Sequence, residues 1–217
     1  MSEFSDLRFM DAALALGRSG LGTTAPNPCV GCVIVKSGRV VGRGVTAAGG
    51  RPHAERVALD EAGKESHGAT AYVTLEPCAH TGQTPPCADA LVEAGIGRVV
   101  IACTDPDPRT AGQGISRLQE VGIEVVTGIR QAEAEQHHAG FFTRLGQGRP
   151  LMVIDGNPKG YDLAVDNFGP GGLQNWLKSP PVQELTRVRL IPGSEAEKAA
   201  IEANMADAIV PELDTGR

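Results

Sequence analysis

Three potential metal ligands and one potential proton shuttle occur in two short segments of the sequence. His53 and Glu55 share the run PHAE, Cys78 follows a proline, and Cys87 comes nine positions later. One imidazole and two thiolates are ligands that zinc prefers, and three protein ligands leave a fourth coordination position for water. This is the arrangement of a catalytic zinc, because the metal makes a bound water acidic enough to ionise near neutral pH.

The chemistry that this set could perform is hydrolysis at a ring carbon that bears an exocyclic amine. Glu55 can take a proton from water and deliver it to the ring nitrogen and to the leaving ammonia without binding the metal. An H-x-E run followed by P-C and a second cysteine is typical of zinc deaminases, in which the glutamate has this role. A closed structural zinc site would instead need a fourth ligand, for which Cys29, Cys32 and His80 are the candidates.

An alternation of helices and strands must position these residues. Apolar periodicity predicts a helix over residues 3–18, followed by a hairpin with strands at 30–35 and 39–45. Later strands are predicted at 69–75, 98–103 and 123–127, and later helices at 53–62, 87–94, 113–121 and 131–145. This order indicates a three-layer α/β/α domain with a central mixed sheet.

The regular alternation ends near Gly146, which divides the chain into two predicted regions. Residues 1–147 form the α/β domain, and residues 148–217 form a C-terminal extension. Repeated Gly and Pro residues interrupt the extension, and only 194–209 has a helical pattern there, with Ser194 as N-cap. Phe168 and Trp176 are candidates for an exposed patch of this extension.

Composition and charge exclude several classes of protein. The formal net charge is −6, and the sequence has no basic stripe with interleaved aromatic residues, so we expect no nucleic-acid partner. No apolar run reaches the roughly 20 residues that span a bilayer, so we expect no membrane insertion. Five cysteines without a secretion signal favour a reducing cytoplasm.

Two further pairs of residues could suggest metal sites but favour a simpler interpretation. Cys29 and Cys32 form a C-x-x-C at the start of a predicted strand, where residues three apart face opposite sides, so we expect small core residues. His137 and His138 are neighbours on the last predicted helix. Adjacent helical residues point about 100° apart and do not easily share a metal. We expect both histidines at the surface or at an interface.

The sequence between about residues 6 and 150 resembles the deaminase half of the bifunctional riboflavin-biosynthesis deaminase/reductase, in the cytidine deaminase-like superfamily. The runs that support this resemblance are APNPCVGCVIV (25–35), GGRPHAE (49–55), GATAYVTLEPCAHTGQTPPC (68–87), DPDP (105–108), GQGI (112–115), GFF (140–142) and GRP (148–150). The eight-residue spacing between the two cysteines is specific, because cytidine and tRNA-adenosine deaminases usually have two residues there.

The resemblance implies a cytidine deaminase-like fold and a defined reaction. The implied substrate is 2,5-diamino-6-ribosylamino-4(3H)-pyrimidinone 5′-phosphate, which would lose its ring 2-amino group as ammonia. The residues in matching motif positions imply zinc ligation by His53, Cys78 and Cys87, with Glu55 as the proton shuttle. The resemblance also implies a homodimer or homotetramer.

The same resemblance suggests contacts with the substrate. Asn27 and His80 would contact the ring and its ribose-phosphate side, and Gln83 lies in the same motif. Many members have a basic residue at the position of Gln83, which would suit a phosphate, so another cation would have to replace it here. Arg51, Lys36 and Arg109 are equivalent candidates at this point. Many members also have histidine at the position of Thr46.

The C-terminal extension departs from the family pattern. In the family, a reductase domain begins with a strand that ends in lysine and is followed by Ser-Leu-Asp-Gly, whereas this chain has LMVIDGN at 151–157. The run GPGG at 169–172 has a proline where a phosphate-binding loop needs an amide donor. We therefore expect no NADPH site in residues 148–217 and a separate reductase in the pathway.

Two alternatives remain at this point. A paralogue could keep the zinc chemistry and act on another aminopyrimidine, or on a pterin- or purine-like ring, in secondary metabolism; Gln83 and the unusual extension motivate this hypothesis. A non-enzymatic, zinc-stabilised scaffold is the second alternative. The intact Glu55 opposes it, because a structural metal site has no need of a proton shuttle.

Overall fold

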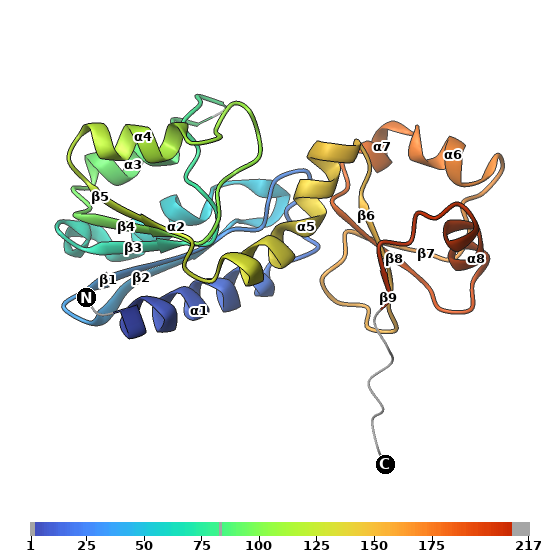
Figure 1. The fold of residues 1–217 in the computed structure, drawn as a ribbon, viewed down its shortest axis with the longest axis horizontal. Coiled ribbons are helices and arrows are strands. Elements are labelled where there is room, and N and C mark those ends of the chain that lie inside the picture. The colour runs from blue at the N-terminus through green and yellow to red at the C-terminus, as the bar shows by residue number, and fades with distance from the viewer. Residues whose placement is uncertain (1–2, 83, 210–217) are drawn as a thin grey trace, which may run out of the picture. The chain divides into compact units, whose positions relative to one another are not determined.

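The chain forms two compact units, which are described separately. The computed structural model describes residues 3–82 and 84–209 (Figure 1). The first unit comprises Met1–Gly20 and Cys29–His138, and the second comprises Leu21–Pro28 and Ala139–Arg217. The long helix α5 (Gln131–Gln147) begins in the first unit and ends in the second.

The first unit is built around a five-stranded mixed sheet with the strand order β2-β1-β3-β4-β5. Strand β1 pairs antiparallel with β2 and β3, and β3, β4 and β5 are parallel. Its strands are β1 (Gly31–Lys36), β2 (Arg39–Val45), β3 (Thr70–Val73), β4 (Arg98–Ile101) and β5 (Glu124–Thr127). Its helices, besides α5, are α1 (Glu3–Ser19), α2 (Ala54–Ala62), α3 (Cys87–Glu93) and α4 (Gln113–Glu120), with 3₁₀ turns at Ala48–Gly50 and Gly63–Ser66.

Helices cover both faces of this sheet. Figure 1 shows α3 and α4 on one side of the strands, and α1 with the first part of α5 on the other. Helix α2 packs on β1 and β2 and also contacts α3, which places it in the same layer as α3 and α4. The predicted three-layer α/β/α fold with a central mixed sheet is thus confirmed.

One close packing contact fixes the position of α2 on the sheet. A Cβ atom at Gly44 in β2 would lie 2.0 Å from the carbonyl oxygen of Ala54, the first residue of α2. Real Cβ atoms do not approach oxygen so closely, so only glycine fits there. The beginning of α2 therefore lies directly against the sheet, and this beginning carries His53 and Glu55.

The expectation that His137 and His138 lie at the surface is wrong. The two side chains are only 6% and 2% exposed. The Nε2 atom of His137 lies 2.6 Å from the carbonyl oxygen of Cys29, and that of His138 lies 3.2 Å from Oγ1 of Thr74. Helix α5 packs here with a face broad enough to bury two adjacent residues. Burial holds the pKa of His138 well below its ordinary value.

The second unit contains a sheet of its own, which the sequence analysis did not anticipate. Four parallel strands follow the order β7-β8-β6-β9. The strands are β6 (Leu151–Ile154), β7 (Leu163–Val165), β8 (Arg187–Leu190) and β9 (Ala208–Ile209), and the helices are α6 (Gly172–Leu177), α7 (Pro180–Gln183) and α8 (Glu195–Glu202). The prediction that only 194–209 is helical was wrong, because α6 and α7 are helical too and α8 ends at Glu202. Helices of four to six residues and strands of two to four leave too short a pattern to detect.

The core of the second unit lies between its sheet and the helices α6 and α8. Residues from β6, β7, β8 and both helices form one apolar cluster, to which Phe168 and Trp176 belong. The rings of these two residues lie 5.0 Å apart, and Phe168 is 8% exposed, so they pack inward instead of forming a surface patch. The predicted N-cap of α8 is present, since Ser194 Oγ accepts a hydrogen bond from the amide of Glu197.

In the loops that follow β6 and β7 of the second unit, several polar side chains bind backbone amides of their own loop. After β6, Asp155 accepts the amide of Asn157, and Asn157 accepts the amide of Lys159. After β7, Asn167 accepts the amide of Gly169. These short-range hydrogen bonds define the turns that follow each strand.

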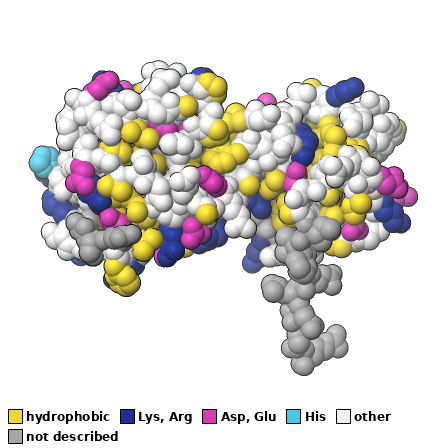
Figure 2. Space-filling model, viewed as in Figure 1, with side chains coloured by type: hydrophobic (Ala, Val, Ile, Leu, Met, Phe, Trp, Pro, Cys, Tyr) yellow, Lys and Arg dark blue, Asp and Glu magenta, His cyan; other side chains and the backbone are white. Residues whose placement is uncertain are grey.

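The surface carries a mixture of charges. On the face shown in Figure 2, the Lys and Arg side chains are interspersed with Asp and Glu over the described residues. In the part of the chain that the structure describes, no helix is long and apolar enough to cross a membrane.

Candidate active site

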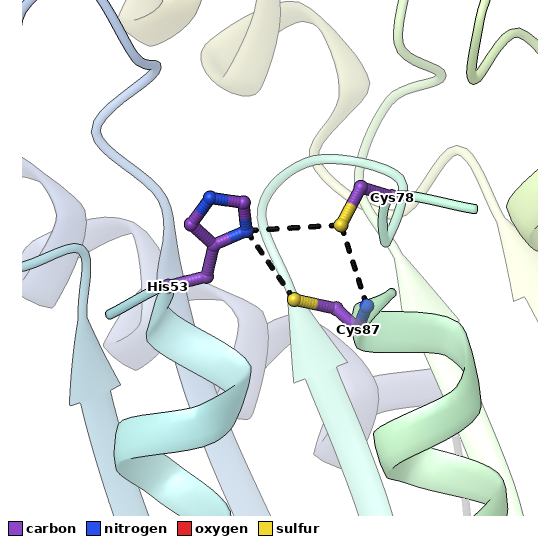
Figure 3. Close-up of side chains that lie close together, drawn as sticks. All are labelled: His53, Cys78 and Cys87. Carbon is purple, nitrogen blue, oxygen red and sulfur yellow. Dashed lines mark hydrogen bonds between the residues drawn. The ribbon is translucent and has the colours of Figure 1, made fainter. Parts of the chain in front are cut away.

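The structure brings together the side chains of His53, Cys78 and Cys87. The Nδ1 atom of His53 lies 3.7 Å from Sγ of Cys78 and 3.3 Å from Sγ of Cys87, and all three ligand atoms lie within 4.8 Å of one another. Figure 3 shows the imidazole and the two sulfur atoms pointing toward a common centre from three different backbone segments. Residues 25 and 34 positions apart in the sequence thus meet in one cluster.

Local structure explains how each ligand arrives at this point. His53 is the N-cap residue of α2, and Cys87 is the first residue of α3. Cys78 lies in the loop that connects β3 to α3, and its sulfur accepts a hydrogen bond of 3.3 Å from the backbone amide of Cys87. The loop leaves the carboxyl end of a parallel strand, where open α/β sheets place their ligand-binding residues.

The sulfur of Cys78 is held as a thiolate. Hydrogen bonds from the Cys87 side chain and from His53 outweigh the cost of burial and lower the pKa of Cys78 to about 4. The pKa of the Cys87 thiol lies above its ordinary value, because the neighbouring sulfur and burial both oppose a second negative charge. The hydrogen bond with Cys78 raises the pKa of His53. The three groups therefore share protons among themselves, and a bound divalent cation would displace these protons.

Glu55 lies close to the three ligands, and its side chain is buried. The residue is only 3% exposed, and its Oε2 atom is buried with no hydrogen-bond partner among the described residues. Burial, together with the negative charge of Cys78, raises the pKa of Glu55 to about 7. A carboxyl group that titrates near neutrality suits both removal and delivery of a proton.

The donor atoms fit zinc. Two thiols and one imidazole form the group, and among the described residues no further Cys, His, Asp or Glu ligand atom joins it. The candidates for a fourth ligand, Cys29, Cys32 and His80, lie outside the group, so the arrangement matches a zinc site with an open position. Cys32 is fully buried in β1, where burial and the nearby charge of Glu55 raise its pKa.

The predicted substrate contacts lie in different places. His80 belongs to the loop of Cys78, and its Nδ1 atom lies 3.3 Å from Oγ1 of the buried Thr110. Asn27 lies in the segment assigned to the second unit, where its amide binds the carbonyl oxygen of Thr24. Gln83 lies outside the described residues. The substrate roles of these three residues stay predictions.

The three cations considered for a phosphate are not equivalent. Lys36 ends β1 at the edge that pairs with the beginning of β3, opposite the edge that carries Cys78, and it binds the carbonyl oxygen of His67. Arg51 donates to the hydroxyl of Thr84 in the loop between the two cysteines, 3.1 Å away. Arg109 pairs with Asp107 in the loop after β4. The antiparallel register of β1 thus removes Lys36 from the candidates.

Sequence reasoning missed two acidic residues beside the ligands. Glu76, two residues before Cys78, is 3% exposed and accepts backbone amides from the segment 105–115. Asp105 is 8% exposed, and burial, with the charges of Asp107, Glu76 and Cys78, raises its pKa to about 6. The only signal in the sequence is that both residues lie within the runs that carry the family resemblance.

Comparisons with known proteins agree with this geometry. Residues 4–103, which include all four residues of the site, match the family model described as the zinc-binding region of cytidine and deoxycytidylate deaminases. The match and the clustered ligand atoms confirm the predicted zinc cofactor.

The chain is similar to proteins named for riboflavin biosynthesis and for pyrimidine deamination. The riboflavin biosynthesis protein RibD of Haemophilus influenzae is 52% identical over 156 residues, which are 71% of this chain and 42% of that protein. This chain therefore spans less than half the length of that relative. A solved structure of a Thermotoga maritima diaminohydroxyphosphoribosylaminopyrimidine deaminase/5-amino-6-(5-phosphoribosylamino)uracil reductase is 25% identical, with a TM-score of 0.76, and the match covers 93% of this chain and 84% of that one.

One relative is matched over almost its whole length. The diaminohydroxyphosphoribosylamino-pyrimidine deaminase of Buchnera aphidicola is 50% identical over 146 residues, which are 67% of this chain and 99% of that protein. Identity at this level over a whole protein establishes common family membership. The chain therefore belongs to the diaminohydroxyphosphoribosylaminopyrimidine deaminase family, within the cytidine deaminase-like superfamily.

Proposed function

We propose that this protein is a zinc-dependent hydrolase that deaminates 2,5-diamino-6-ribosylamino-4(3H)-pyrimidinone 5′-phosphate in riboflavin biosynthesis and releases ammonia. The observation that carries the proposal is the cluster of His53, Cys78 and Cys87 beside the buried, partly unpartnered carboxyl group of Glu55. The name of the Haemophilus relative supports the pathway, and the name of the Buchnera relative supports the substrate.

The residues of the site have separate tasks in this mechanism. His53, Cys78 and Cys87 would hold zinc, which supplies the Lewis acidity that makes water nucleophilic near neutral pH. Glu55 accepts a proton as water adds to the ring carbon that bears the 2-amino group. It delivers this proton to the ring nitrogen and then transfers the proton of the added hydroxyl to the departing nitrogen, so that the carbon–nitrogen bond breaks and a ring carbonyl forms.

Substrate recognition belongs to the loops around this cluster. His80, held by Thr110, and Asn27 are the proposed contacts with the ring and the ribose-phosphate side. Arg51 and Arg109 are the proposed cations for the phosphate, because both lie on loops at the same edge of the sheet as Cys78. Gln83 is a proposed uncharged contact in the same loop.

The test of this proposal is ammonia release from the phosphorylated diaminopyrimidine by the zinc-loaded protein without NADPH. We expect turnover that a strong chelator abolishes and that added zinc restores. Zinc bound in stoichiometric amount without turnover would contradict the proposed substrate. Turnover of a non-phosphorylated aminopyrimidine, pterin or purine ring in the same assay would then identify the paralogue hypothesis as correct.

The remaining proposals concern partners and setting. We expect a homodimer or homotetramer in light scattering, and a monomer at micromolar concentration would contradict this.

We also propose that residues 148–217 do not by themselves reduce the product, because the amide of Gly172 is already bonded to Gly169 and Pro170 has no amide hydrogen. NADPH oxidation in the presence of the product would contradict this. We also propose a cytoplasmic setting, because a reducing compartment keeps thiol ligands such as Cys78 and Cys87 free to bind the metal.

A further inference from the structure

The loop that carries Cys78 is fastened to a second loop by a single buried carboxylate. The two loops follow β3 and β4, which are adjacent parallel strands, so both leave the same edge of the sheet. Glu76 lies in the first loop, and its side chain reaches across to the segment 105–115 in the second.

Four backbone amides donate to this carboxylate. Oε1 of Glu76 accepts the amides of Gly114 at 3.0 Å and Ile115 at 3.2 Å. Oε2 accepts the amides of Gly112 at 3.1 Å and Asp105 at 3.3 Å. A buried charge is costly unless it is hydrogen-bonded, and here both oxygen atoms are fully used by one segment.

Two further contacts join the same two loops. A Cβ atom at Gly114 would lie 2.0 Å from the carbonyl oxygen of Pro77, so the backbones approach each other more closely than any other residue would allow. The hydroxyl of Thr110 lies 3.3 Å from Nδ1 of His80. The residues on either side of Cys78 are thus held by the segment 105–115, and the Glu76 carboxylate holds that segment.

We propose that Glu76 is a positioning residue for the deamination. Its carboxylate fixes the segment 105–115 against the metal-ligand loop, and through Thr110 it fixes the side chain of His80. The inference rests on the proposed function, because the consequence of the fixed geometry is catalytic. Glu76 itself neither binds the metal nor touches the reacting atoms: its two oxygen atoms are occupied by backbone amides.

The first experiment compares Glu76→Gln with the matched control Asp6→Asn. In glutamine, an NH2 group replaces one carboxylate oxygen. The backbone amides that donated to that oxygen then face another donor and lose their acceptor. Asp6→Asn makes the same chemical change at the opposite end of the sheet, where Asp6 pairs with Arg98 at the beginning of β4.

We expect the Glu76→Gln variant to retain zinc and to lose kcat/KM by roughly 10²-fold, since a displacement of about 1 Å can have that effect. The Asp6→Asn variant should keep the kcat/KM of the parent protein although its fold is less stable. Unchanged kcat/KM in Glu76→Gln, or an equal loss in both variants when both are folded, would overturn the proposal.

A second variant keeps the inference testable if Glu76→Gln does not fold. Thr110→Val preserves shape but removes the hydroxyl that faces His80. If Glu76 acts through Thr110, Thr110→Val lowers kcat/KM, and the loss is divided between kcat and KM as it is in Glu76→Gln. The double variant Glu76→Gln/Thr110→Val should then be no less active than the more affected single variant. Parent-like activity of Thr110→Val, or additive losses in the double variant, would contradict the proposed route.

A readout without substrate separates failure of this inference from failure of the proposed function. The ring resonances of His80 in NMR spectra should shift in the same direction in Glu76→Gln and Thr110→Val, and should stay unchanged in Asp6→Asn. This holds whether or not the parent protein deaminates the phosphorylated pyrimidine. Unshifted His80 resonances in Glu76→Gln would contradict the positioning role even if the deaminase assay succeeds.

Discussion

The loops at the carboxyl ends of the strands differ sharply between the two units. In the second unit, Asp155, Asn157 and Asn167 bind amides two residues further along the chain, so each turn satisfies its own polar groups. In the first unit, Asp105 and Asp107 bind amides in the same local way, but the Glu76 carboxylate reaches across to another loop, and Oε2 of Glu55 has no partner among the described residues. Locally satisfied side chains stabilise turns, whereas groups held together over long sequence distances and left incompletely satisfied are available for chemistry.

The largest expected effect is the loss of the metal from the first unit. Cys78→Ser should reduce bound zinc from about one per chain to nearly none, because a three-ligand site does not survive loss of a thiolate. The melting temperature should fall by roughly 10 °C or more, since metal binding contributes to folding and about 1 kcal/mol moves the melting temperature of a domain of this size by about 2–4 °C. Elemental analysis and calorimetry measure both quantities.

The control for this variant is Cys103→Ala. Cys103 is buried in the same unit, and its thiol binds the carbonyl oxygen of Thr74 instead of the metal group. It should keep zinc despite a moderate loss of stability. Zinc retained by Cys78→Ser would show that the cysteine is not a ligand and would remove the contrast between the units.

Loss of the proton shuttle should affect activity alone. Glu55→Gln should lower kcat by about 10²- to 10⁴-fold, the range of general acid–base catalysis, while zinc content stays unchanged. Ammonia release measures the effect. Glu61→Gln, the same substitution on the exposed side of α2, should keep the activity of the parent protein. Parent-like activity of Glu55→Gln would instead favour the scaffold hypothesis.

The opposite end of the first sheet should affect acid stability but not chemistry. Burial raises the pKa of Asp6, but hydrogen bonds from Arg98 and Tyr72 outweigh this and lower it overall. A lowered pKa in the folded state gives stability that is fully present above the unfolded pKa of about 3.9 and is lost as pH falls through the folded value.

We therefore expect Asp6→Asn to cost about 3 kcal/mol near pH 7, the lower end for breaking a buried ion pair. This difference in free energy of unfolding should shrink when denaturant titrations are repeated near pH 3 and below. A difference that stays constant with pH would show that the carboxylate charge is not what stabilises this end of the sheet.

The smallest expected effect concerns a turn of the second unit. Asn157→Ala removes the hydrogen bond to the amide of Lys159 and should cost about 1 kcal/mol, as for a typical neutral hydrogen bond. Zinc content and ammonia release should not change. A loss of activity in this variant would mean that the loop after β6 contributes to catalysis, and the contrast between the two sets of loops would no longer hold.

The sequence was sufficient to predict the first unit and its ligands because their signals are local. The helices have apolar stripes, and His53 and Glu55 share one short run. The sheet of the second unit could not be predicted, since its strands are too short to show a period and pair with strands far along the chain. The burial of His137 and the amides bound by Glu76 depend on packing partners over 28 residues away, which no local pattern reports.

The close contact at Gly44 has a consequence for the genetics of this protein. Any missense change of the glycine codon adds at least one carbon atom where a carbonyl oxygen lies 2.0 Å away. Such alleles push aside the helix that begins beside His53, so they combine lower stability with lower activity. They would be loss-of-function variants, although the altered residue touches neither metal nor substrate.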